Sequence, residues 1–205
     1  MSNPRRTLAI RGFIVSSLAL FSFFGYGCNS DSPTLGAQFF ASVTPTTARL
    51  VKLQPLASGG SSVTVQAVVY GPDTTLDLYS FDFGVKIGNL SLLHFAPGSA
   101  VAGSALVATG GQTVVATASP DMSDPSIIVV SVHKTGGGAG DGVPGNSAAI
   151  VSLTFTATMA GSTTLSIAAA PTPTAKDSAD ATIGSITFDT ANGTVTGISS
   201  GGGPY

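Results

Sequence analysis

LDLYSFDFGVKIGNLSLLHF, residues 76–95, is the stretch of this chain that decides its fold. Its first half alternates, and a period of two is typical of a β-strand, whose successive side chains point to opposite sides. We therefore predict a strand that ends at Ile87, a turn at Gly88-Asn89 and a second strand from Leu90. The row predicted to face the core is Tyr79, Phe81, Phe83, Val85 and Ile87, and the row predicted to face outward is Leu78, Ser80, Asp82, Gly84 and Lys86.

The composition of the whole chain supports an all-β fold. Only 9% of the 205 residues are charged, and Glu is absent. Thr, Val, Ser and Gly are abundant, which favours strands and turns over helices. Apolar runs recur between turn signals, and no segment reads as a crossover helix. The prediction is an antiparallel two-sheet jelly-roll sandwich of about nine strands.

The N-terminal residues have the features of a targeting segment. Three arginines precede the apolar run 13–24, which has the length of a secretory signal rather than of a membrane span. Cys28, the single cysteine, follows after three further residues, and Gly-Tyr-Gly-Cys resembles the lipobox of bacterial lipoproteins. That resemblance implies a lipid on Cys28 and a location at the bacterial cell envelope or surface. An ordinary cleaved signal with an incidental Cys, which would make the protein extracellular, and an uncleaved anchor are the alternatives.

The domain prediction follows from these boundaries. It assigns residues 1–27 to a signal peptide, 28–47 to a polar tether, 48–200 to the folded body and 201–205 to a flexible tail. Two details are predicted within the body. Residues 183–188 and 194–198 should form a hairpin around Asn192-Gly193, and the glycine-rich residues 135–146 should form a flexible loop. That loop matches a dinucleotide fingerprint by letter only, because a strand follows it instead of the helix that the fingerprint needs.

Catalytic and metal-binding chemistry finds little support in the sequence. His94 and His133 are the only histidines, and no Gly-x-Ser-x-Gly elbow occurs. All ten acidic residues are Asp, and most lie in predicted turns, where Asp usually caps its own backbone. A calcium site from Asp121 and Asp124, or from Asp177 and Asp180, is conceivable. We expect no enzyme activity, no cofactor, no zinc site and no nucleic-acid partner, since no basic patch is present.

The ordered series of motifs resembles the cohesin domain of cellulosome scaffolds over about residues 48–198. The series runs SVTVQAVVYGP, YSFDFGVKIGNLSLLHFAPGSAV, SIIVVSVHK, a glycine loop, AAIVSLTFTATMAGSTTLSI and ITFDTANGTVTGI. The family often has Tyr-Asp-Pro after the strand that matches Tyr79–Val85, where this chain has Val85-Lys86-Ile87-Gly88. The resemblance implies a non-catalytic module that holds a dockerin-bearing or other secreted protein and is linked to polysaccharide degradation.

The resemblance also implies which surface binds the partner. The matching strands are 76–87, 112–119, 126–134 and 162–168. The residues expected on this surface are Leu78, Ser80, Asp82, Ile127, Val129, Ser131 and His133. Ile127 and Val129 would form an exposed apolar patch, unless a loop or the segment 37–43 covers them. A carbohydrate-binding module using Tyr70, or a structural envelope lipoprotein, is the alternative, and a monomer is expected.

Overall fold

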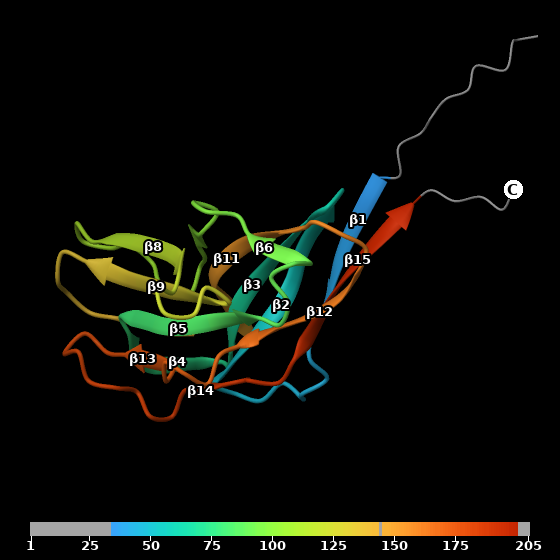
Figure 1. Cartoon of the computed structure of the whole chain (residues 1–205). Helices are drawn as coiled ribbons and strands as arrows, with labels where there is room; N and C mark the ends of the chain where they lie inside the picture. Colours follow the sequence, from blue (N-terminus) through green and yellow to red (C-terminus); the bar gives the residue numbers. More distant parts are fainter. Residues whose placement is uncertain (1–33, 144, 201–205) are drawn as a thin grey trace, which may run out of the picture. The chain divides into compact units, whose positions relative to one another are not determined.

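Strands build the part of the chain that the computed structural model describes, residues 34–143 and 145–200 (Figure 1). They form two large sheets and one two-stranded sheet. Within these residues no helix is long and apolar enough to cross a membrane. The predicted signal peptide, Cys28 and the tail 201–205 lie outside the described residues. An all-β sandwich is therefore confirmed for the body of the protein.

The first large sheet, sheet A, has the strand order β1-β15-β12-β5-β9-β8, and β13 also pairs with β5. All of its strand pairs are antiparallel. Its strands are β1 (Thr34–Phe40), β5 (Ser80–Ile87), β8 (Thr113–Pro120), β9 (Ile127–Thr135), β12 (Gly161–Ile167), β13 (Thr174–Lys176) and β15 (Gly193–Ser200).

The second large sheet, sheet B, has the order β14-β2-β3-β11-β6, and β7 also pairs with β11. Its strands are β2 (Leu50–Gly59), β3 (Ser62–Tyr70), β6 (Leu93–Phe95), β7 (Val101–Ala102), β11 (Ser147–Ala157) and β14 (Thr187–Phe188). The parallel pairing of β14 with β2 makes this sheet mixed. The small sheet pairs β4 (Asp73–Leu78) with β10 (Asp141–Val143).

The core lies between the two large sheets and contains the predicted apolar row of β5. Phe81 and Val85 are fully buried, and Phe83 and Ile87 are 1% exposed. Phe155 of sheet B packs edge-on against Phe95, with ring centroids 5.7 Å apart. The alternation of residues 81–87 thus predicted correctly which side of this strand is buried.

Three predictions about the elements are wrong. Thr34–Phe40, assigned to the tether, forms β1 and pairs along its whole length with β15. The hairpin around Asn192-Gly193 does not form, because β14 joins sheet B and β15 joins sheet A. The described residues hold fifteen strands rather than about nine, since five of them have only two or three residues.

Candidate partner-binding face

The four strands expected to carry the partner surface are neighbours in sheet A, in the order β12-β5-β9-β8. We call their solvent side the outer face. Asp82 lies opposite Ser131, which lies opposite Thr117 on β8. The adjacent rows align Ser80, His133 and Val115, then Gly84, Val129 and Ser119, then Lys86 and Ile127. Six of the seven residues expected on the partner surface therefore share one side of one sheet.

Leu78 is the exception, because its side chain is fully buried. The sequence alternates without a visible break from residue 76 to 87, but the chain forms two strands there. Tyr79 lies between them: its N–H donates to the Lys176 carbonyl, and its carbonyl accepts from the Lys134 N–H. The alternation shifts at this point, so that Leu78 faces the core and Tyr79 is only half-buried. The placement of Leu78 on the partner surface and of Tyr79 in the core is wrong.

The two residues of the predicted apolar patch differ in exposure. Val129 is 37% exposed, whereas Ile127 is half-buried. The segment 37–43 does not cover it, because β1 pairs with β15 at the far edge of the sheet. Val115 of β8, also 37% exposed, belongs to the same face and was missed. The alternation of Val115, Thr117 and Ser119 in the sequence is the signal that could have found it.

Gly84 explains why Ile127 is partly covered. A Cβ atom at position 84 would lie 2.9 Å from Cγ2 of Ile127 and 3.1 Å from Cβ of Ala168. Because Gly84 has no side chain, the outer face has a furrow at this position. Ile127 and the chain after β12 pack into that furrow. Any larger residue at position 84 would displace one of them.

A groove of about 520 Å³ continues the outer face past the end of β5. Lys86 and Asp124 supply opposite charges at its wall, and Ile127 and Ala168 supply apolar surface. Hydrogen bonds from the Ser126 hydroxyl and N–H lower the pKa of Asp124, with a smaller contribution from Lys86. The groove has the size and the mixed chemistry to accept a side chain of a bound protein.

The aspartates considered for calcium make hydrogen bonds and ion pairs within the protein. Asp121 accepts hydrogen bonds from the Ser123 N–H at 2.7 Å and from the Asp124 N–H at 3.1 Å. Asp177 accepts from the N–H groups of Ala179 and Ala181, and Asp180 pairs with Lys176 at 2.8 Å. Within residues 34–143 and 145–200, no group of three or more His, Cys, Asp or Glu side chains could hold a metal ion.

The side chains of Gln112 and Lys134 bind the backbone of the glycine loop. The Gln112 amide donates to the carbonyls of Gly137 (2.7 Å) and Ala139 (3.2 Å). The Lys134 ammonium, fully buried, donates to the Ala139 carbonyl and pairs with Asp141 at 2.9 Å. Positive φ angles of 93°, 69° and 105° at residues 136–138 account for the three successive glycines. The glycine loop is therefore held by hydrogen bonds to the rest of the domain, and it leads into β10.

Asp77 fastens the same loop from the other side. It accepts hydrogen bonds from the Gly140 N–H and from the hydroxyl and N–H of Ser178. The Ser178 hydroxyl is the main cause of a lowered pKa at Asp77; burial opposes it, and the two N–H groups and the charge of Lys134 add to it. One carboxylate thus joins β4, the glycine loop and the segment after β13.

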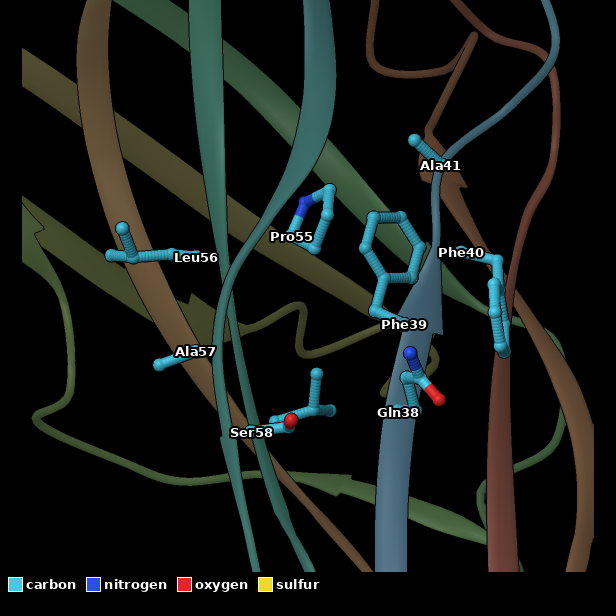
Figure 2. Close-up of a pocket in the computed structure, with 9 residues that line it drawn as sticks. Gln38, Phe39, Phe40, Ala41, Pro55, Leu56, Ala57 and Ser58 are labelled. Atoms are coloured by element: carbon cyan, nitrogen blue, oxygen red, sulfur yellow. The ribbon is translucent and has the colours of Figure 1, made fainter.

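Two further hollows lie away from the outer face. A groove of about 420 Å³ lies between β1 and β2. Figure 2 shows the buried ring of Phe39 beside Pro55, with Phe40 and Leu56 pointing away from each other. The other hollow, about 330 Å³, is lined by Tyr70, Asn146 and threonines 46 and 47. Burial raises the pKa of the Tyr70 phenol, and a side-chain hydrogen bond with Gln54 partly offsets this.

The solved structures similar to this chain include cohesin modules. The second type II cohesin module of the adaptor ScaA scaffoldin from Acetivibrio cellulolyticus is 12% identical, with 74% of this chain and 86% of that one covered and a TM-score of 0.47. The sixth cohesin of scaffoldin B from the same organism, solved in complex with a Cel5 dockerin mutant, is 18% identical, with 71% and 96% covered and a TM-score of 0.47. The cohesin module of a family 33 glycoside hydrolase from Clostridium perfringens is 9% identical, with 82% and 97% covered and a TM-score of 0.41.

Comparison with family models and with curated proteins finds no match. The three TM-scores are below 0.5, so these structures carry no argument about the function of this chain.

Proposed function

We propose that this protein is a non-catalytic binding module of the bacterial cell envelope whose outer face binds a secreted protein, with a dockerin-bearing protein as the first candidate. One observation supports the proposal most. The four strands that the cohesin resemblance assigns to the partner surface lie next to one another in sheet A and turn six of the seven expected residues to solvent.

The chemistry of the outer face also fits a protein partner. Val115 and Val129 are apolar and exposed, while Ser131 and Thr117 offer hydroxyl groups between them. Specific interfaces combine such an apolar centre with a polar surround. Lys86 lies near the end of the face, so that charge is confined to its margin and to Asp82.

Binding can be tested with residues 28–205 carrying Cys28→Ser, immobilised and exposed to purified dockerin-bearing proteins from the same organism. Val129→Lys should weaken the affinity at least about tenfold, since it places a charge in the middle of the apolar surface. Leu56→Lys is the matched control, because Leu56 is 53% exposed on β2 of the other sheet. Equal loss in both variants, or in neither, would contradict the proposed face.

Attachment to the membrane is the second part of this proposal. Cells that express the full chain and receive labelled palmitate should incorporate the label into the wild-type protein. The Cys28→Ser variant should carry no label and should leave the membrane fraction. Equal labelling of the variant would show that Cys28 is not the site of lipid attachment.

A carbohydrate ligand is the second candidate function, and the hollow beside Tyr70 favours it. A half-buried phenol next to Asn146 and two threonines offers a ring surface with hydrogen-bonding groups around it. Retention of the soluble protein by insoluble polysaccharide, abolished by Tyr70→Ala and unchanged by Val129→Lys, would favour this function over protein binding.

A further inference from the structure

Strand β8 is an edge strand of sheet A: it pairs with β9 on one side, and its other edge pairs with no strand of the described residues. Two hydrogen bonds show which backbone N–H and C=O groups of β8 point toward β9 and which point toward the free edge. The Lys134 N–H donates to the Tyr79 carbonyl, on the β5 side of β9, and the Asp121 N–H donates to the Ile127 carbonyl. Alternate residues of an antiparallel strand bond to the same neighbour. Odd-numbered residues of β8 therefore bond to β9, and Val114, Ala116 and Ala118 direct their N–H and C=O groups to the open side.

This edge lacks the features that usually prevent pairing with another strand. Such edges are commonly short, charged, bulged or interrupted by proline. β8 has eight residues, no charged side chain and an unbroken register with β9, and its only proline is the last residue, Pro120. The other edge strand of sheet A, β1, differs, because the Ala37 N–H donates to the Gly60 carbonyl.

Apolar surface accompanies the open hydrogen-bonding groups. The inward apolar side chains of β9, such as Ile128 and Val130, are at most 1% exposed, whereas those of β8 are only half-buried. The three on β8 are Val114, Ala116 and Ala118. Val101 of β7, the strand of sheet B that approaches β8, is 61% exposed. A strand added at this edge would cover part of this surface as well as complete the ladder.

We propose that the occupant of this edge is β8 of a second copy, paired antiparallel about a two-fold axis at Ala116. In that register Ala116 faces its own equivalent and Val114 faces Ala118 of the second copy, so that six backbone hydrogen bonds form. On the outer side, Val115 meets Thr117 of the second copy and Thr113 meets Ser119. No charge of β8 opposes this approach.

Because a single pair of edge strands buries little surface, the dimer should be weak and should exchange quickly. We expect a dissociation constant on the order of 0.1 mM. This pairing does not depend on the proposed function, since it uses the edge of the sheet and not its face. It would add a concentration-dependent dimer to the monomer that the sequence predicts.

Sedimentation of residues 28–205 with Cys28→Ser, which include the compact unit from Asp31 onward, tests the proposal. The mean mass should rise toward that of a dimer as the concentration approaches 1 mM. Ala116→Pro should remain monomeric, because it removes an edge N–H that the fold does not use. Ala116→Ser keeps that N–H and should dimerise like the wild type. A monomeric wild type, or a dimer unaffected by Ala116→Pro, would overturn the proposal.

Amide hydrogen exchange gives a second measurement that does not depend on any variant. Exchange at Val114, Ala116 and Ala118 should slow with rising concentration, whereas Val115 and Thr117, bonded to β9, should be slow throughout. Dimerisation without slower exchange at the three edge residues would show that the copies meet elsewhere.

Discussion

Lys134 and Lys176 are both ion-paired lysines, but their surroundings differ. The Lys134 side chain is fully buried, and its partner Asp141 is 20% exposed. The Lys176 side chain is 32% exposed and pairs with Asp180, which is 83% exposed. Water screens the second pair and not the first, so the two contacts have different consequences for stability despite nearly equal distances.

Lys134→Ala should lower the free energy of unfolding by about 3 kcal/mol, because it leaves Asp141 and the Ala139 carbonyl without their buried partner. Urea unfolding followed by circular dichroism measures the change. Lys176→Ala is the control and should unfold at the wild-type urea concentration. If the two variants unfold alike, the buried pair does not stabilise the glycine loop.

Acid should destabilise the protein through several hydrogen-bonded aspartates at once. The pKa values of four aspartates are lowered from their ordinary 3.8, chiefly by a hydroxyl donor that lies two positions further on for three of them and is Ser178 for the fourth; the four are Asp73, Asp121, Asp124 and Asp77. A carboxylate with a lowered folded-state pKa stabilises the fold above its unfolded-state pKa, and this stabilisation disappears as the pH falls through the folded-state value. Urea midpoints should therefore be level from pH 7 to about 5 and fall below about pH 4.

Asp77→Asn tests this explanation at a single position. The variant should be less stable at pH 7, by about 1–2 kcal/mol for the weakened hydrogen bonds, and should lose less of its remaining stability in acid. Ser178→Ala, which removes the strongest donor to Asp77, should shift the pH dependence in the same direction. An acid slope identical to that of the wild type in both variants would contradict the assignment.

At the scale of strands, the alternation of apolar residues predicted the long strands correctly. It did not predict where one strand ends and the next begins. Residues 81–87 have one uninterrupted alternation and one buried side, as expected. Tyr79 looks like part of the same row, because a change of pairing partner between β4 and β5 leaves no mark in a pattern of apolar residues. Strand β14 has only two residues, and its partner β2 lies more than a hundred residues away.

The sequence predicts a tether where β1 forms, because the apolar segment there is short and follows a polar one. The structure shows that Phe39 is 2% exposed and belongs to the core, whereas Phe40, next to it, is 51% exposed. Phe39→Ala should cost about 3–5 kcal/mol. Phe40→Ala, the neighbouring control, should cost less than about 1 kcal/mol. Equal effects in urea unfolding would mean that β1 does not pack as described.

For the molecule as a whole, much of the candidate face could be predicted because the four strands expected to carry it are neighbours in sheet A. The alternation of β9 and of residues 80–86 then placed six side chains on the correct side. The furrow at Gly84 and the groove beside Lys86 could not be predicted, since both depend on where the chain after β12 returns. That path is set by tertiary contacts and not by local pattern.

The two ends of the folded body are adjacent, because Thr34 lies opposite Ser200. A circular permutant that joins residue 200 to residue 34 by a short Gly-Ser linker, and opens between Gly110 and Gly111, should therefore fold. Both glycines have free space around them. Opening between Asp82 and Phe83, in the middle of β5, should abolish folding. Circular dichroism of both permutants decides whether the first folds and the second does not.

The position of Thr34 beside Ser200 also determines how this protein would respond to mechanical load. β1 and β15 run antiparallel, and the chain enters one and leaves the other at the same end of the ladder. Tension applied between the two termini would break the β1–β15 hydrogen bonds one after another, as in a zipper, at low force. Tension between the N-terminus and a protein held on the outer face would instead be transmitted sideways through β15, β12 and β5.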